Sequence, residues 1–408
     1  MNISENIRIA ILGLSANKLR AALTMLGIMI GVAAVITLMA IGDGVNRYVT
    51  DQFIGLGTNL VFVVPNEDPF RSEPSLTMSD AETLADSALV PGVVAVAPLY
   101  NRNIEVTYGG EADTVPVQAS TPDYAQIRGY EMDRGRFFND ADYNGRSRVV
   151  VLGADTVDNL YPDDVDPLET DVKIQGINFR VIGVLEGEGG GIFGSRDNLI
   201  ILPLTTAQER LFSARSQRTG KLLVDTILLQ AVSSEAVQDI VIDASNVLRQ
   251  NHSITFRDED DFAVLTQEDF LDSFGQVIGV LTLFLGAIAG ISLLVGGIGI
   301  MNIMLVTVTE RTREIGLRKA VGAKRVDILS QFLTEAIILS VVGGLLGILM
   351  GFLGATAIQF AVPDLDTSIT LGAVSLAVGF SVAVGLFFGI YPASRAAALD
   401  PIEALRFE

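Results

Sequence analysis

The chain of 408 residues contains no cysteine and a single histidine, His252. The lack of cysteine excludes disulfides, thiolate metal sites and a cysteine nucleophile. A single histidine excludes histidine clusters that hold metals and most histidine-based catalytic triads. No stretch matches the G-x-x-x-x-G-K-[ST] pattern that cradles nucleotide phosphates. We therefore expect a protein that is not an enzyme and that binds no cofactor and no metal itself.

Charge is scarce outside one region. Only 19% of the residues are charged, 49% are hydrophobic, and the mean hydropathy is +0.44. The net charge of -20 comes from Gly44 to Gly275, where 37 acidic residues stand against 17 basic ones. An acidic surface of this kind repels nucleic acid, which we exclude as a partner. The composition predicts a membrane part joined to an acidic, water-exposed part.

Four apolar segments are long enough to cross a lipid bilayer: residues 21–41, 276–308, 332–360 and 371–391. At about 1.5 Å per residue, each spans a hydrocarbon core of roughly 30 Å. The first is too long for the core of a signal peptide and is interpreted as an uncleaved anchor. The second exceeds one bilayer, so its first turns are expected to project as a stalk. Pro392 is expected to end the fourth.

The remaining segments differ in character. Residues 1–20 carry Ile3, Ile7 and Ile11 at helical spacing, typical of an amphipathic helix at the membrane surface. Residues 42–275 mix short strand and helix patterns over about 230 residues, enough for two subdomains. Strands are expected at 59–64, 93–97, 104–108, 115–119, 148–152, 172–185 with a hairpin turn at 176–177, 199–202 and 223–232, and helices at 79–88, near 123, at 154–160 and at 234–249. The predicted fold class is a membrane α-helical protein with four transmembrane helices and a large α+β domain between the first two.

One basic stretch orients the chain. Glu310 to Ala323 reads E-R-T-R-E-I-G-L-R-K-A-V-G-A and lies between the second and third apolar segments. Lysine and arginine are retained on the cytoplasmic side of a cell membrane. We therefore place residues 309–331 and both termini, including the tail 392–408, in the cytoplasm. The acidic domain is then extracytoplasmic.

Small residues recur one turn apart in every apolar segment. Glycines four residues apart let helix backbones approach closely, so packing between helices is expected at each of them. They are Gly27, Gly31, Gly286, Gly290, Gly343, Gly347, Gly351, Gly385 and Gly389. The interiors of the segments hold one ionisable side chain, Glu335, which argues against an ion-coupled carrier. We expect Glu335 at the water interface; the alternative is an ion pair with a base of the cytoplasmic loop.

Three further patterns are candidate binding sites. Gly187 to Gly194 (G-E-G-G-G-I-F-G) lacks the lysine of a phosphate-binding loop and indicates a flexible external loop. Asp258 to Asp261 (D-E-D-D) lacks the glycine and final glutamate of a calcium loop, so a solvated acidic face is favoured over a Ca²⁺ site. His252 follows a predicted helix and is expected to be a surface or capping residue.

The basic stretch and the third apolar segment resemble the FtsX-like permease domain of MacB-type ABC transporters. Four external segments look like the extracytoplasmic core domain of the same family: 120–138 (S-T-P-D-Y…R-G-R-F-F), 148–153 (R-V-V-V-L-G), 179–186 (F-R-V-I-G-V-L-E) and 201–211 (I-L-P-L-T-T-A-Q-E-R-L). The endings Y-P-A-S-R and D-P-I-E-A-L are similar too. The resemblance covers nearly the whole chain. The best-known members carry an ATP-binding domain before the first span, which this sequence lacks.

The resemblance implies a homodimeric transmembrane subunit that works with two copies of a cytoplasmic ATP-binding subunit, which brings ATP and Mg²⁺. ATP-driven closure would move porter-like and sabre-like external subdomains mechanically and promote efflux of a substrate. The cytoplasmic segment would be the coupling helix that docks on the ATPase. Carried over by position, its contact residues are Glu310, Arg311, Arg313, Glu314, Gly316, Arg318, Lys319 and Gly322. Spacing alone predicts an ion pair between Glu314 and Arg318.

Two other functions stay open at this point. Lipoprotein-release permeases are related, but their basic-loop signature differs from this one. FtsX-like proteins transmit a signal that regulates an external enzyme, but their external domain is much smaller. The substrate is open, as is a periplasmic adaptor, or membrane-fusion protein, as a further partner beside the lipid bilayer.

Overall fold

The computed structural model describes residues 18–54, 59–66, 76–162, 164–187, 189–191, 194–195, 197–212, 214–216, 219–255, 258–363 and 365–405. Most of the expected amphipathic helix at 1–20 lies outside these residues. The chain forms two compact units, Met1–Val49 with Phe274–Glu408, and Thr50–Ser273. We call the first the membrane unit and the second the α/β unit.

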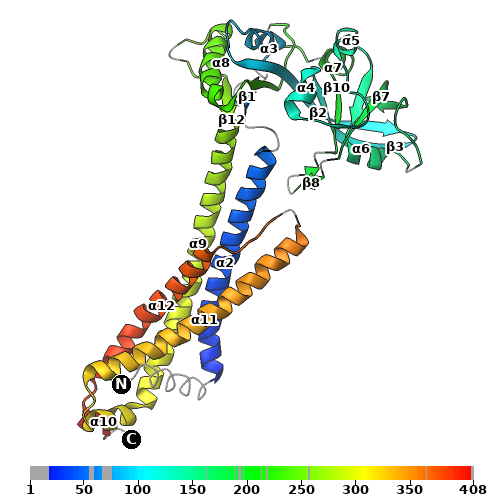
Figure 1. Ribbon diagram of the computed structural model, residues 1–408. Coiled ribbons are helices and arrows are strands. Elements are labelled where there is room, and N and C mark those ends of the chain that lie inside the picture. The colour runs from blue at the N-terminus through cyan, green and yellow to red at the C-terminus, as the bar shows by residue number, and fades with distance from the viewer. Residues whose placement is uncertain are drawn as a thin grey trace. The chain divides into compact units, whose positions relative to one another are not determined.

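Four helices are long and apolar enough to cross a membrane, as predicted: α2 (Lys18–Ile54), α9 (Gln267–Glu310), α11 (Arg325–Ala361) and α12 (Leu371–Ala398) (Figure 1). Helix α9 has 44 residues, so at about 1.5 Å per residue it is roughly twice as long as a bilayer core is thick. The prediction that Pro392 ends the fourth span is wrong. Helix α12 continues through Pro392 to Ala398, because Ala393, Ala396 and Ala397 are buried and their packing holds the last turns in place.

Helices α2 and α11 pack with a four-residue repeat on both sides. A Cβ atom built on Gly343, Gly347 or Gly351 of α11 would lie 3.2, 2.7 and 2.8 Å from the Cβ atoms of Ile28, Val32 and Ile36 of α2, respectively. All three α2 side chains are buried. Since any larger residue would force the helices apart, the glycines set the separation of α2 and α11.

The other glycines divide into two groups. Gly27 lies against Gly296 of α9, Gly385 against Ser340, and Gly389 against Ala336. Gly31 also meets α9, through Leu293. Gly286 and Gly290 differ, because no atom of the described residues comes within 4 Å of a Cβ built on either. The predicted packing is therefore present within one copy for the glycines of α2, α11 and α12, whereas neither of the two predicted glycines of α9 meets another helix in the described chain.

The α/β unit is built on one ten-stranded sheet in the order β12-β1-β11-β2-β3-β10-β5-β7-β4, with β6 paired to β2 and β7. The strands are β1 (Leu60–Pro65), β2 (Val93–Tyr108), β3 (Glu111–Ser120), β4 (Met132–Gly135), β5 (Val149–Leu152), β6 (Asp171–Ile174), β7 (Ile177–Leu185), β10 (Ile200–Pro203), β11 (Thr226–Ala231) and β12 (Phe262–Thr266). The predicted strands 93–97 and 104–108 are one strand, β2, whose 16 residues pair with β11 at one end and with β3 along the rest. Strand β2 therefore joins the two halves of the sheet.

The helices of this unit are short except for one. They are α3 (Met78–Leu84), α4 (Asp123–Arg128), α5 (Asp140–Asn144), α6 (Ala154–Leu160), α7 (Leu204–Arg210), the 3₁₀ helix η1 (Ser234–Ala236) and α8 (Val237–Asn251). Helix α3 begins one residue before its expected cap Ser79, because Thr77 and Asp80 form a capping box. The predicted hairpin is present, but its turn lies one residue earlier than the expected 176–177. Ile174 pairs with Ile177 across Gln175 and Gly176, whose φ angles of 49° and 78° are those of a type I′ turn.

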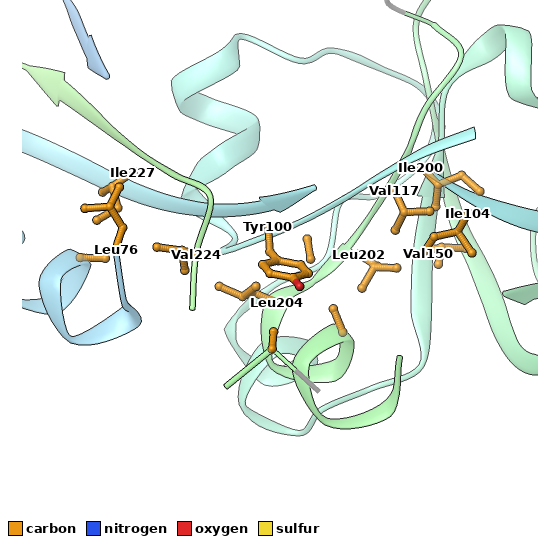
Figure 2. Close-up of a cluster of buried hydrophobic side chains, with 14 of the residues drawn as sticks. Leu76, Tyr100, Ile104, Val117, Val150, Ile200, Leu202, Leu204, Val224 and Ile227 are labelled. Carbon is orange, nitrogen blue, oxygen red and sulfur yellow. The ribbon is translucent and has the colours of Figure 1, made fainter. Parts of the chain in front are cut away.

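The larger hydrophobic cluster of the α/β unit extends over both halves of the sheet. Figure 2 shows Tyr100 and Ile104 of β2, Val117 of β3, Val150 of β5 and Ile200 of β10 gathered in one buried cluster. Strands β5 and β10 are buried at every position, which matches their uninterrupted apolar sequences V-V-V-L and I-I-L-P. The α+β prediction therefore holds.

Candidate functional site

The basic stretch forms a helix–turn between two transmembrane helices. Helix α9 ends at Glu310, Arg311 leaves the helical conformation, and α10 (Thr312–Ala320) follows. A turn then passes through Gly322, whose φ of +107° an L-residue adopts only with strain. Lys324 precedes α11, and its backbone N–H donates to Asp327 Oδ2 at 2.9 Å.

One face of α10 is turned into the membrane unit. Thr312 and Ile315 are buried, and Ile315 joins the core that includes Phe332 of α11. Gly316 is covered by the short helix α13 (Pro401–Leu405): a Cβ built on it would lie 2.8 Å from Ala404 Cβ. A direct contact of Gly316 with a partner protein would therefore require α13 to move.

Two arginines of this segment, Arg311 and Arg318, bind α11. Arg318 Nη1 donates to Gln331 Oε1 at 2.9 Å, and Nη2 donates to Glu314 Oε1 at 2.5 Å, so the predicted pair with Glu314 is confirmed. Arg311 Nη1 lies 3.5 Å from Glu335 Oε2. Glu335 is only 5% exposed, so the prediction of a water-interface position is wrong. The alternative, a pair with a base of the loop, is what the fold provides, because a buried carboxylate requires an opposite charge.

The side chain of Lys319 contacts the end of α12 and does not extend into solvent. Its Nζ donates to the carbonyl oxygens of Ala397 and Leu399, both at 2.6 Å. These carbonyls end α12, where helices leave unpaired oxygens and where the helix dipole favours a positive charge. Partial burial and the nearby Arg325 lower the pKa of Lys319, while Asp400 opposes them.

The opposite face of α10 is exposed and partly apolar. Arg313, Leu317 and Val321 follow one another at intervals of four residues and are all exposed; Leu317 is 58% exposed and Val321 is 83% exposed. We call these three residues the docking face. Sequence reasoning chose the charged residues and missed Leu317 and Val321. The available signal was the four-residue spacing of Leu317 and Val321 from Arg313, which places them on the face of the helix opposite Thr312 and Ile315.

His252 has a different environment from the one predicted. It is the C-cap residue of α8, but its side chain is only 10% exposed, so a surface position is wrong. Its Nδ1 lies 2.7 Å from Asp261 Oδ1 and its Nε2 lies 3.3 Å from Asp80 Oδ2. Phe262 packs edge-on against the ring. We call His252, Asp80 and Asp261 the histidine clamp, since they join α8, α3 and the residue that precedes β12.

The residues of the other acidic and glycine-rich patterns contact other parts of the same chain. Asp258 accepts from the backbone and hydroxyl of Thr255, and Asp260 binds the guanidinium of Arg249 at 2.7 Å. Among the described residues, no group of three histidine and acidic side chains could hold a metal ion. Within the glycine-rich segment, Gly190–Gly191 pairs with Gly194–Ser195 as the short strands β8 and β9.

Two family descriptions match the chain. The MacB-like periplasmic core domain matches residues 21–245, and the FtsX-like permease C-terminal domain matches residues 286–401. The protein named macrolide export ATP-binding/permease protein MacB of Bdellovibrio bacteriovorus is 38% identical over 97% of this chain and 60% of its own length. The chain thus spans about three fifths of the length of such relatives. A protein of Bacillus subtilis named uncharacterized ABC transporter permease YknZ is 34% identical over 100% of both chains.

Solved structures were compared as well. The periplasmic region of MacB from Actinobacillus actinomycetemcomitans superposes with a TM-score of 0.43 and 19% identity, covering 55% of this chain and 96% of that one. The extracellular domain of YknZ superposes with a TM-score of 0.41 and 18% identity, covering 51% of this chain and 100% of the other.

Proposed function

The chain belongs to the MacB-like family of ABC transporter permeases with an FtsX-like C-terminal domain, and from this premise we propose that it is the transmembrane subunit of a transporter of the mechanotransmission type. A separate cytoplasmic ATP-binding subunit, in two copies, would bind ATP and Mg²⁺ and hydrolyse the nucleotide. Its movement would displace the extracytoplasmic α/β domain and promote export of a substrate. Positive charge in the α9–α11 connection supports a cytoplasmic position for that connection and for both termini.

The observation that carries this proposal is the geometry of α10. The helix is fixed to α11 by Arg318 and to α12 by Lys319, while its docking face is free of described neighbours that would bury it. A helix held firmly on one side and exposed on the other suits a contact that must transmit force. Burying Leu317 and Val321 against a partner would contribute about 1.5–3 kcal/mol each.

The experiment is assembly of the permease, in nanodiscs, with a candidate ATP-binding subunit. The double variant Leu317→Glu, Val321→Glu should weaken binding by at least about 100-fold, because two apolar contacts are lost and two carboxylates would be desolvated. Ile242→Glu is the matched control: Ile242 has the same 58% exposure but lies in the α/β unit. Unchanged affinity of the double variant would show that the ATPase docks elsewhere.

We further propose that α9 is covered by a second copy of the chain. Only 11% of the most apolar stretch of α9 is buried, against 28–39% for the corresponding stretches of α2, α11 and α12. Gly286 and Gly290 lie in this part of α9, and a small-residue surface permits close helix contact. Because the chain has no cysteine, a single Ala287→Cys should cross-link two copies in the membrane. Leu349→Cys on α11, which is 55% exposed, is the control; equal cross-linking of both would contradict an α9 interface.

The substrate that we propose to test first is a macrolide. The support is the name of the MacB relatives, which specifies macrolide export. An adaptor that contacts the α/β domain would be a further partner. Accumulation of radiolabelled macrolide in cells with and without the assembled transporter tests the cargo, and unchanged accumulation would exclude macrolides as the substrate.

A further inference from the structure

Two neighbouring cations of α10 point to two different transmembrane helices. Arg318 binds Gln331 of α11, a side chain that is only 2% exposed. Lys319 binds the last carbonyl oxygens of α12, at Ala397 and Leu399. The two contacts lie on the side of α10 away from the docking face. Residues that the family resemblance assigns together to the ATPase contact are therefore engaged inside the membrane unit.

Two effects strengthen the contact that Lys319 makes with α12. An ammonium group that donates two hydrogen bonds of 2.6 Å to helix-terminal carbonyls combines charge assistance with the favourable sign of the helix dipole. The carbonyls belong to residues 78 and 80 positions away in the chain. A displacement of α10 would therefore act directly on the cytoplasmic end of α12.

Helix α12 connects onward to the outer side of the membrane unit. Along its length it packs on α11 through Gly385 and Gly389. Before its first turn, Asp366 and Ser368 bind Arg47 of α2 at 3.3 and 2.6 Å. Helix α2 continues along the chain to Ile54, past Thr50, the first residue of the α/β unit. These packed contacts form a contiguous connection from α10 to α2.

We propose that Lys319 is a positioning residue that makes α12 follow α10, and that it is not a contact of the ATP-binding subunit. This inference rests on the proposed function. Force applied to the docking face would move α10, Lys319 would carry the end of α12 along, and the 365–370 connection would pass the displacement to α2. Binding of the ATPase and transmission of its movement are then separable, because different faces of one helix perform them.

The test compares Lys319→Met with Lys324→Met, the same substitution on an exposed lysine of the adjoining turn. Each is built into the complete permease with one added cysteine, Leu371→Cys, at the exposed first residue of α12, carrying an environment-sensitive fluorophore. Two quantities are measured in nanodiscs: the Kd for the ATP-binding subunit, and the fluorescence change on adding ATP. Wild type and Lys324→Met should bind and respond. Lys319→Met should bind within threefold of the wild-type Kd and lose at least four fifths of the response.

Two conservative variants complete the series. Lys319→Arg retains donors for both carbonyls and should restore most of the response. Lys319→Gln retains one amide donor, so this variant should give a partial fluorescence response. It also serves as the test if the Lys319→Met variant does not fold. A Kd raised tenfold or more in folded Lys319 variants, as expected for the docking-face double variant, would overturn the inference, as would a full fluorescence response in Lys319→Met. Failure of the wild-type permease itself to bind the subunit would instead overturn the proposed function, and the inference with it.

Discussion

Replacing His252 by glutamine should destabilise the α/β unit in a pH-dependent way. The imidazole lies between Asp80 and Asp261, and the Asp80 side chain is only 2% exposed. Asp80 also accepts from the Thr77 backbone at 2.9 Å, the Thr77 hydroxyl at 2.7 Å and Asn251 Nδ2 at 3.2 Å. Removing the histidine would leave a buried carboxylate with these donors but without an opposite charge.

The magnitude follows from this geometry. Breaking a buried ion pair by removing one partner costs about 3–5 kcal/mol. Because Asp80 keeps three donors, we expect a smaller loss, about 2–3 kcal/mol in the free energy of unfolding. For a unit of this size, each kcal/mol lowers Tm by about 2–4 °C, so the expected fall is about 4–12 °C.

The direction of the pH dependence follows from both pKa values. Burial by itself lowers the pKa of His252, but hydrogen bonds and charges from Asp80 and Asp261 outweigh it and raise the pKa above 6.5. Burial by itself raises the pKa of Asp80, but His252 and Thr77 outweigh it and lower the pKa below 3.8. The histidine contribution is therefore complete below pH 6.5 and is lost as the pH rises through the raised value. The aspartate contribution is complete above pH 3.8 and is lost as the pH falls through the lowered value.

Pulse proteolysis of the intact permease in urea, read at the α/β unit, measures this stability. The difference between wild type and His252→Gln should be largest between about pH 4 and 6.5 and should shrink toward pH 9, where the imidazole is neutral in both folded and unfolded states. Asp258→Asn, a change to an exposed acid of the same acidic run, should leave the stability unchanged at both pH values. A His252→Gln effect that is equal at pH 6 and pH 9 would refute a charged clamp, and no effect at either pH would refute the buried pair.

Two further predictions concern glycines. Gly347→Leu should destabilise the membrane unit by about 1–3 kcal/mol, since a Cβ there already lies 2.7 Å from Val32 Cβ, and thermal unfolding in detergent should show a lower Tm. Gly290→Leu should instead reduce cross-linking between copies and leave the Tm of a single copy unchanged. The reverse pattern would contradict the assignment of Gly347 to packing within one copy and of Gly290 to packing between copies. Gly153→Ala should destabilise the α/β unit by about 1–3 kcal/mol, because its Cβ would overlap the backbone oxygen of Asp197; pulse proteolysis checks this against Gly275→Ala, which meets no described atom within 4 Å, and equal stability of the two variants would be inconsistent with the close approach at Gly153.

Features set by local chemistry could be predicted from the sequence. A bilayer requires about twenty consecutive apolar residues, and a run of that length is visible without any knowledge of its neighbours. The hairpin within 172–185 was predictable to within one residue, with its turn at 175–176 and not at 176–177, because turn dihedral angles depend on the residues in the turn. The Glu314–Arg318 pair depends only on helical spacing.

Features that depend on distant partners could not be predicted. The burial of His252 depends on Asp80, which is 172 residues away in the chain, and on a ring contact with Phe262. The continuation of α12 through Pro392 depends on packing of the alanines that follow, which outweighs the local preference of proline to end a helix. The sequence left two positions open for Glu335, and only tertiary packing, which puts its carboxylate 3.5 Å from Arg311, decides between them.

The connection between α9 and α11 shows most clearly which features local sequence sets and which depend on tertiary packing. Its sequence determined that a short basic helix connects two membrane spans, because charge retention and helical spacing are properties of the segment itself. Only the tertiary structure decided which way each cation points. Lys319 reaches Ala397 and Leu399 because α12 ends there with free carbonyl oxygens, and Arg318 reaches Gln331 because the second turn of α11 presents that side-chain amide oxygen to α10. The other side, with Leu317 and Val321, is thereby left exposed.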